Sequence, residues 1–288
     1  MIGGMTKTFT LGGELTINRL GFGAMRLPAG TFRGPARDPE TGIAVLRRAV
    51  ELGVNHIDTA AFYQRDGVRA NELIRKALTP YPDDLVIATK VGPMLDANGV
   101  PGSEATPEQL RGLVEDNLTD LGLDRLDLVY LRVGGMTGPG GASIGDRFAE
   151  LARLRDEGLI RHVGISNVDG AQLAEARAIA PVSAVQNRFG VHEQADLELL
   201  AECERDGIAF APFFSLSGEP GAGIEAVAAR HGASVQQIAL AWTLAVSTAV
   251  LAIPGTGSLD HLAENMRAGD IQLTTEDLAA LGADGESG

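Results

Sequence analysis

The sequence predicts an α/β fold, a (β/α)8 or TIM barrel with an N-terminal β-hairpin plug, as a single domain over residues 1–288. Eight short apolar runs alternate with amphipathic helical stretches, which is the pattern of repeated βα units. These units occupy roughly 250 residues, the usual size of such a barrel. Before them, two short segments of alternating polar and apolar residues flank Gly12 and Gly13, and this pattern is typical of a hairpin.

The eight apolar runs are the predicted barrel strands. They comprise residues 20–24, 54–58, 85–90, 126–132, 160–166, 183–187, 208–213 and 249–254. An open, doubly wound sheet also alternates strands with helices. However, the first predicted strand leads into a polar loop, and its GFGAM supplies only the G-x-G of the dinucleotide motif G-x-G-x-x-G. Eight units behind a hairpin therefore favour the closed barrel.

The helical stretches between the strands carry start and stop signals. The clearest helical patterns cover residues 41–53, 106–122 and 193–207. Thr106 followed by Pro107 is a typical N-cap with a first-turn proline. Several stretches end at a glycine, the residue that commonly terminates a helix, at Gly53, Gly122, Gly158 and Gly207.

Composition excludes several classes of function. A net charge of -14 argues against nucleic acid or an anionic membrane as a partner, because both need basic patches. The single cysteine, Cys203, excludes a disulfide framework and a thiolate metal site. No apolar run approaches the length of about 18 residues that spans a bilayer, so we expect a cytoplasmic protein. We expect no metal site, because no metal-ligand spacing relates His56, His162, His192, His231 and His261.

Polar residues stand where the predicted strands end. In such barrels the chemistry lies at the C-terminal ends of the strands, so these side chains are expected to converge. Two Gly/Pro-rich loops, 92–106 and 133–144, follow predicted strands, and we expect them to lie over this face and to move. The strand-end residues are Asp58, Lys90, Arg132, Ser166, Asn167, Gln186, Asn187, Gly255 and Thr256, and Tyr63 follows Asp58 in the next loop.

Asp58, Tyr63 and Lys90 form a chemically coherent set. A tyrosine phenol has an ordinary pKa of about 10 and is a poor proton donor at neutral pH. An adjacent ammonium lowers the pKa of the phenol, and a carboxylate holds that ammonium in place. Lowering the pKa by about three units corresponds to roughly 4 kcal/mol and brings the phenol into the range of general acid catalysis.

At this point the sequence resembles a known family. NHIDTAAFY, IATKVG, HVGISN, AVQN and IPGTGSLDHLAENM are similar, in order and spacing, to motifs of the aldo-keto reductases over nearly the whole chain. The resemblance implies a nicotinamide cofactor across the strand ends and hydride transfer to the carbon of a small-molecule carbonyl substrate. It further implies that Tyr63 protonates the carbonyl oxygen, with Asp58 and Lys90 as the supporting pair.

The resemblance also implies a set of cofactor-binding residues. Phe213 falls where the family has an aromatic residue on the nicotinamide ring, although ordinary core packing and a register shifted to Phe214 remain open. Ser166, Asn167 and Gln186 match the residues that hold the carboxamide. Leu216 and Ser217 are then expected near the pyrophosphate, and Glu264 and Asn265 near the adenine. The remaining members of the set are Gly23, Ala24, Met25, Pro254, Gly255, Thr256, Ser258 and His261.

Arg132 departs from the family pattern, which has a histidine hydrogen-bonded to the substrate carbonyl at this place. Arginine also donates, but it adds a permanent positive charge beside Tyr63 and Lys90. This charge favours substrates with an anionic group or an electron-rich ring oxygen. A bacterial subset that resembles pyridoxal reductases shares this arginine, so Arg132 is predicted as a catalytic residue. The alternative is that Arg132 pairs with an acid, Asp127 or Asp58.

The adenosine end is a second departure. Many members hold the 2′-phosphate of NADPH with Lys, Ser and Arg, where this chain has Gly255, Thr256 and His261. Hydroxyl and backbone N–H groups of residues 256–258, at the start of the next helix, are expected to bind the phosphate. Without a fixed cation the site discriminates less strongly against NADH. We therefore expect NADPH as the cofactor, with NADH as the alternative. The alternative is that these residues only form a turn and an N-cap.

Three functions are consistent with these features. The first is NAD(P)H-dependent reduction of an aldehyde or ketone, with pyridoxal or another small aromatic aldehyde as a candidate substrate. The second is a sensor or partner subunit that binds the cofactor with little turnover, because Arg132 replaces histidine. The third is a lyase or isomerase in which Lys90 forms a Schiff base. The sequence leaves the choice between monomer and homo-oligomer open.

Overall fold

The computed structural model describes residues 7–31, 34–96, 101–135, 138–139, 141–216 and 221–285. Its centre is a parallel sheet with the strand order β13-β12-β11-β10-β7-β4-β3. These strands follow seven of the predicted apolar runs. Their bounds are β3 (Phe22–Gly23), β4 (His56–Asp58), β7 (Val86–Val91), β10 (Leu126–Arg132), β11 (Ile160–Ser166), β12 (Ala184–Gln186) and β13 (Ala209–Phe210).

Residues 249–254, the eighth predicted strand, close the barrel through single bridges instead of a regular strand. Val250 forms a parallel bridge with Phe210 of β13, and Ala252 forms one with Leu20, two residues before β3. The Leu251 N–H donates to the Phe210 carbonyl oxygen at 2.8 Å. This segment therefore joins the first strand to the last, and the predicted (β/α)8 barrel is confirmed.

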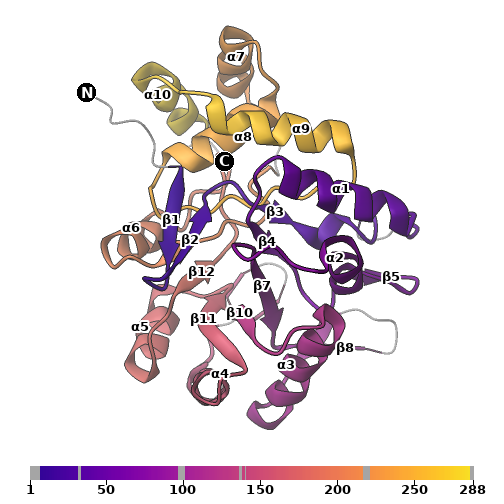
Figure 1. The fold of residues 1–288 in the computed structure, drawn as a ribbon. Helices are drawn as coiled ribbons and strands as arrows, with labels where there is room; N and C mark the ends of the chain where they lie inside the picture. The colour runs from indigo at the N-terminus through magenta and orange to yellow at the C-terminus, as the bar shows by residue number, and fades with distance from the viewer. Residues whose placement is uncertain are drawn as a thin grey trace.

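Helices surround the strands, and the four C-terminal helices gather on one side, at the top of Figure 1. The bounds are α1 (Pro39–Glu51), α2 (Ala70–Leu78), α3 (Pro107–Leu121), α4 (Gly145–Asp156), α5 (Gly170–Ile179), α6 (Leu197–Arg205), α7 (Ala222–His231), α8 (Val235–Ala245), α9 (Leu259–Arg267) and α10 (Thr275–Gly285), with 3-10 turns at Ala24–Arg26 and Ala268–Asp270. In the described part of the chain, no helix combines the length and apolar character needed to cross a bilayer.

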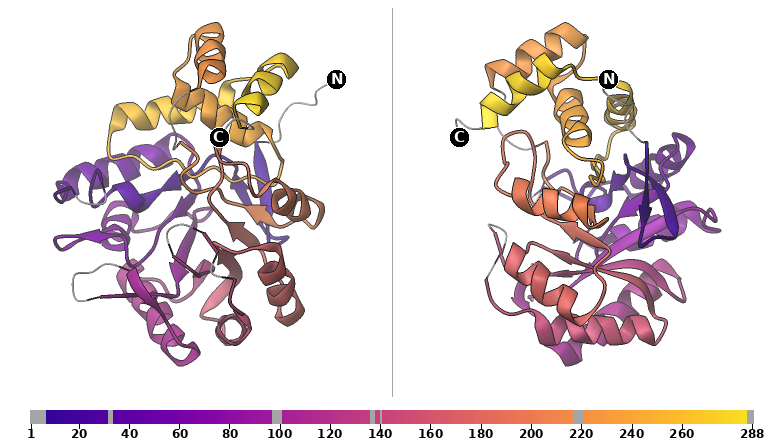
Figure 2. Two further views of the ribbon diagram at one scale, coloured as in Figure 1. Left: turned by 180° about the vertical axis from the view of Figure 1, so that it is seen from behind. Right: turned by 90° about the vertical axis from the view of Figure 1, so that its left-hand side faces the viewer.

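The predicted hairpin is formed by β1 (Thr8–Leu11) and β2 (Leu15–Asn18), which pair antiparallel around two glycines with positive φ. It lies across one end of the barrel (Figure 2). Leu11 and Ile17 of the hairpin pack against Leu128, Tyr130 and Leu251 in a buried cluster with other strand residues. The hairpin therefore fills the end of the barrel opposite the strand C-termini.

The predicted helix signals are confirmed. Thr106 and Gln109 form a capping box at the start of α3, with Pro107 in the first turn. Gly122 then ends that helix in the left-handed conformation. Gly53, Gly158 and Gly207 likewise have φ values of 92°, 90° and 67°, which a glycine adopts without strain.

The loops after the strands contain structure that the sequence analysis did not predict. Within residues 92–106, β8 (Pro93–Leu95) and β9 (Pro101–Glu104) pair antiparallel. A second small hairpin, β5 (Gln64–Arg65) with β6 (Val68–Arg69), follows Tyr63 directly. The sequence predicts residues 92–106 only as a Gly/Pro-rich loop, because the pairing of β8 with β9 depends on contacts that local sequence patterns do not reveal.

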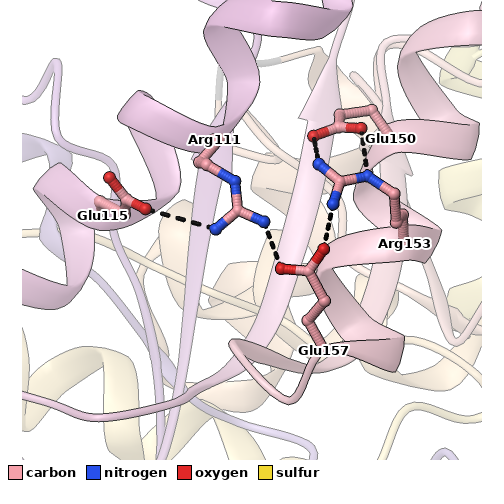
Figure 3. A network of polar contacts seen from close by, with 5 residues as sticks. All are labelled: Arg111, Glu115, Glu150, Arg153 and Glu157. Carbon is pink, nitrogen blue, oxygen red and sulfur yellow. Dashed lines mark hydrogen bonds and ion pairs between the residues drawn. The ribbon is translucent and has the colours of Figure 1, made fainter.

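Neighbouring helices are also linked on the outer surface by ion pairs. Figure 3 shows Arg111 and Glu115 of α3 beside Glu150, Arg153 and Glu157 at α4. Glu157 accepts from Arg111 and from Arg153, so one carboxylate joins the two helices. Such exposed pairs each contribute little to stability, about 0 to 1 kcal/mol, and this network takes no part in the site described next.

Candidate active site

Strands β4 and β7 bring Asp58 and Lys90 together at the C-terminal end of the barrel. Lys90 Nζ lies 2.6 Å from Asp58 Oδ1 and donates a second hydrogen bond of 3.0 Å to the Thr59 carbonyl oxygen. Only 4% and 5% of the two side chains are exposed, so little solvent screens the pair. Thr59 was not among the residues predicted from the sequence, although its place directly after the strand-end aspartate was a signal for it.

Tyr63 lies over this ion pair. Lys90 Nζ is 4.9 Å from the centroid of the Tyr63 ring. Two backbone hydrogen bonds fix the tyrosine, one from its own N–H to the Ala60 carbonyl and one from the Ala70 N–H to its carbonyl. The three side chains that the sequence predicted as a set therefore meet in the structure.

The predicted fall in the pKa of Tyr63 is wrong in this structure. Burial raises the pKa of the phenol above its ordinary value, and although Lys90 and Arg132 act to lower it, they do not outweigh burial. The sequence showed the charges but not the low-dielectric surroundings. Tyr63 therefore carries its proton at neutral pH and is present as an acid.

Lys90 remains a cation. Burial acts to lower the pKa of its ammonium, but Asp58 and then Tyr63 outweigh this, so the pKa of Lys90 is raised. A Schiff base requires the neutral amine as nucleophile. The ion pair with Asp58 therefore argues against the lyase or isomerase hypothesis and favours an electrostatic role for Lys90.

Gln186 and Ser166 stand at the ends of the neighbouring strands β12 and β11. Gln186 Nε2 donates to Asp58 Oδ2 at 2.8 Å, so this amide holds the second oxygen of the carboxylate. Ser166 is fully buried, and its Oγ has no hydrogen-bond partner among the described residues. A buried hydroxyl without a partner costs free energy, so this place fits a polar group such as the carboxamide of a nicotinamide.

Arg132 at the end of β10 points toward the same site. Its Nη2 donates to the Gly135 carbonyl at 2.9 Å, and its guanidinium carbon lies 5.2 Å from the centroid of the Phe213 ring. Nη1 is buried without a hydrogen-bond partner among the described residues. Burial lowers the pKa of Arg132, an effect that Tyr63 opposes.

The alternative in which Arg132 pairs with an acid is wrong. Within the described residues Arg132 forms no ion pair. Asp58 is held by Lys90 and Gln186. Asp127 accepts from the Ile87 N–H at 3.0 Å, five strand residues before Arg132. Because Arg132 contacts Phe213, the geometry also favours Phe213 over Phe214 as the aromatic residue of the site.

Asn167 was predicted to bind the carboxamide of the cofactor, and in the structure it also holds the backbone after β10. In a left-handed conformation with φ 62°, its Nδ2 donates to the carbonyl oxygens of Val133 and Gly138 at 2.8 and 2.7 Å. The amide therefore anchors the loop that follows β10. Its role toward a cofactor stays a prediction.

The predicted adenosine end lies between the closing segment and α9. Thr256 Oγ1 accepts from the Ser258 N–H at 3.1 Å, and Ser258 Oγ caps α9 by accepting from the His261 N–H at 3.4 Å. This is the turn and N-cap that the sequence analysis gave as an alternative, and the same hydroxyls remain candidates for phosphate. In α9, His261 of the first turn is exposed, while Asn265 of the last turn is buried.

The other predicted cofactor residues surround this segment. The backbones of Gly23 and Gly255 pack closely against each other. A methyl group placed on Gly255 would be only 2.5 Å from the Gly23 carbonyl oxygen. Gly23 also donates its N–H to the Pro254 carbonyl at 3.3 Å. Ala24 and Met25 form the 3-10 turn after β3, and Glu264 accepts from Gln237 through its backbone carbonyl. Leu216 is 37% exposed, and Ser217 lies outside the described residues.

The chain is similar to known proteins over nearly its whole length. Residues 19–222 and 221–283 match the model of the aldo/keto reductase family. The chain is 45% identical over 283 residues to pyridoxine 4-dehydrogenase of Escherichia coli, covering 96% of this chain and 97% of that protein. An uncharacterised oxidoreductase of Schizosaccharomyces pombe is 39% identical, covering 96% of this chain and 89% of that protein.

Solved structures show the same fold. A thermostable aldo-keto reductase in complex with the inhibitor epalrestat superposes with a TM-score of 0.82 at 29% identity, covering 97% of this chain and all of that one. An aldo/keto reductase of Klebsiella pneumoniae in complex with NADP and acetate has a TM-score of 0.77 at 25% identity, covering 96% and 95% of the two chains. The chain therefore belongs to the aldo/keto reductase family and is an oxidoreductase that acts on small carbonyl compounds.

Proposed function

We propose that this protein reduces pyridoxal or a similar small aromatic aldehyde to the alcohol, with NADPH as its cofactor. When bound, the cofactor supplies the hydride. Two findings support the proposal beyond family membership. The relative that is 45% identical is a pyridoxine 4-dehydrogenase, and the Klebsiella structure was solved with NADP.

One observation carries the proposal: Tyr63 lies over the buried Lys90–Asp58 pair. Hydride addition to a carbonyl carbon leaves a strongly basic oxygen, and Tyr63 is protonated at neutral pH. Lys90, held as a cation at 2.6 Å from Asp58, stabilises the phenolate that forms when the proton leaves. The buried Ser166 hydroxyl orients the carboxamide of the nicotinamide, and Gln186 keeps Asp58 in place.

Arg132 gives this site its substrate preference. Its buried Nη1 has no acceptor among the described residues, so a substrate oxygen satisfies it. Pyridoxal carries a phenolic oxygen next to its aldehyde, and a guanidinium is suited to such an oxygen as a charged donor. The stacking of Arg132 on Phe213 holds the donor rigidly, so little entropy is lost when the substrate binds.

Tyr63→Phe tests this function. The variant removes the proton donor but keeps the ring, so we expect NADPH to bind normally while pyridoxal reduction slows about 100- to 10,000-fold. Loss of nicotinamide absorbance with pyridoxal and with benzaldehyde measures the rate, and quenching of protein fluorescence measures cofactor binding. Benzaldehyde, which lacks the neighbouring oxygen, should have a higher KM than pyridoxal in the wild type.

Tyr81→Phe is the matched control. The Tyr81 hydroxyl donates to the Leu121 carbonyl at 2.7 Å, away from the site, so its loss should leave the rate unchanged. Wild-type turnover in Tyr63→Phe would remove Tyr63 as the acid. Cofactor binding without reduction of either aldehyde by the wild type would instead favour a sensor or partner subunit.

A further inference from the structure

The structure places a cation beside the predicted adenosine end that the sequence analysis did not consider. Arg37 lies in the loop between β3 and α1, and its guanidinium packs onto two glycines. A methyl group placed on Gly257 would be 2.6 Å from Arg37 Nε, and one placed on Gly30 would be 2.9 Å from Nη2. The guanidinium is therefore inserted between the loop before α1 and the loop before α9.

No acid neutralises this guanidinium within the described residues. Arg37 forms no ion pair there, and its buried Nε has no hydrogen-bond partner. The adjacent Asp38 is occupied at the N-cap of α1, where it accepts from the Glu40 N–H at 3.3 Å. A buried donor without an acceptor is unfavourable, so this position suits a ligand that brings one.

The place of Arg37 gives it a specific task. Gly257 stands between Thr256 and Ser258, whose hydroxyls line the turn before α9. The family's cationic side chains are missing from this turn, where Gly255 and His261 stand instead. NADPH differs from NADH only in its 2′-phosphate, so an arginine at this turn is able to distinguish the two cofactors.

We infer that Arg37 binds the 2′-phosphate of NADPH and determines the preference for NADPH over NADH. The inference rests on the proposed function, because it assumes that the turn before α9 binds the adenosine end of the cofactor. The specificity-determining charge thus comes from the first βα loop and not from the C-terminal motif. A methyl group on position 257 would lie 2.6 Å from Arg37 Nε, so a side chain there would shift the guanidinium.

Direct binding measurements test the inference without relying on turnover. Full-length wild type, Arg37→Ala and Arg37→Lys are titrated with NADPH and with NADH, following protein fluorescence. We expect Arg37→Ala to weaken NADPH binding about 10- to 100-fold, the range of a lost charge-assisted hydrogen bond. The dissociation constant for NADH should change less than about 2-fold, and Arg37→Lys should recover part of the NADPH affinity because it keeps the charge.

Two further variants separate charge from structure. Arg48→Ala removes an exposed arginine of α1 that pairs with Glu51, so it should change neither dissociation constant. Gly257→Ala leaves the charge of Arg37 but pushes its side chain away, so NADPH affinity should fall while NADH affinity is kept. Competition with adenosine 2′-monophosphate should weaken in Arg37→Ala, whereas competition with adenosine 5′-monophosphate should not.

The outcomes are distinguishable from a failure of the proposed function. If wild type binds neither cofactor, the proposed function is wrong and the inference falls with it. If wild type binds both and Arg37→Ala leaves the NADPH to NADH ratio unchanged, only the inference is wrong. Equal weakening of both cofactors would assign Arg37 a structural role and would likewise overturn the inference.

Discussion

Tyr63 and His56 show how burial changes the chemistry of single residues. At Tyr63, burial raises the pKa of the phenol despite two neighbouring cations. His56 is 1% exposed, and neither ring nitrogen has a hydrogen-bond partner in the described part of the chain. Burial lowers the pKa of His56 to about 4, against the pull of Asp58. Both groups are therefore held neutral next to the buried ion pair.

His56 should make stability depend on pH. In the unfolded chain histidine titrates near pH 6.5, whereas folded His56 titrates near 4, so the unfolded state binds more protons between these values. The contribution of neutral His56 to the free energy of unfolding is therefore complete above about pH 6.5 and is lost as the pH falls toward 4. From pH 7 to pH 5, the free energy of unfolding should fall by about 2 kcal/mol through this residue.

Urea unfolding of wild type and His56→Gln at the two pH values measures this contribution. The other titrating groups are the same in both proteins, so the fall should be smaller in the variant by about 2 kcal/mol. Identical falls would mean that folded His56 titrates normally.

Among the elements of the fold, the C-terminal ends of β7 and β10 lie in close contact at Gly92. Gly92 follows β7 with φ 121°, and a methyl group placed on it would lie 2.3 Å from the Arg132 carbonyl oxygen. The two strands approach closely only because position 92 has no side chain. This glycine therefore positions Arg132 from the neighbouring strand.

Gly92→Ala should affect both stability and substrate binding. A side chain at this φ is strained and forces the end of β10 to move, so we expect a loss of about 1 to 3 kcal/mol in the free energy of unfolding. The KM for pyridoxal should rise because Arg132 is displaced. Urea unfolding and steady-state kinetics measure the two effects.

Gly112→Ala is the matched control for this substitution. Gly112 is an exposed glycine inside α3 with open space around it, so alanine there should stabilise the protein by about 0.5 to 1 kcal/mol. An alanine at position 92 that left both stability and KM unchanged would show that the strand ends tolerate separation.

At the scale of the whole molecule, Arg19 connects the beginning of the barrel to its end. It follows the hairpin and is 3% exposed. Its Nε donates to the Val250 carbonyl at 3.0 Å, and Nη2 donates to the carbonyls of Leu244 and Ser247. A buried side chain between β2 and β3 thus satisfies backbone groups at the end of α8, in the residues that lead into the closing segment and in that segment itself.

Arg19→Met should destabilise the closed barrel. Methionine keeps an apolar stem of similar length but leaves three carbonyl groups without this donor, so we expect a loss of about 3 kcal/mol in the free energy of unfolding. Lys7→Met is the control, because Lys7 pairs with Asp270 while 79% and 76% of the two side chains are exposed, and its loss should cost less than about 1 kcal/mol. Equal effects of the two variants in urea unfolding would contradict this role for Arg19.

Local sequence patterns were sufficient to predict the alternation of strands and helices, the hairpin, the helix ends and the strand-end positions of Asp58, Lys90 and Arg132. These features depend on local periodicity and on the rule that parallel strands end at one face, so no distant contact is needed to predict them. Tyr63 was predicted for the same reason, since it follows a strand-end aspartate in the next loop.

Features that depend on contacts between distant parts of the chain could not be predicted from local sequence patterns. The pKa of Tyr63 depends on how deeply its loop packs, and the orientation of Arg132 depends on Phe213, which lies after β13. Arg37 and Gly257 lie near opposite ends of the sequence, and no local pattern relates them. They meet because closing a barrel brings its first βα loop beside its last. The closure therefore places the cationic side chain of Arg37 next to the turn before α9.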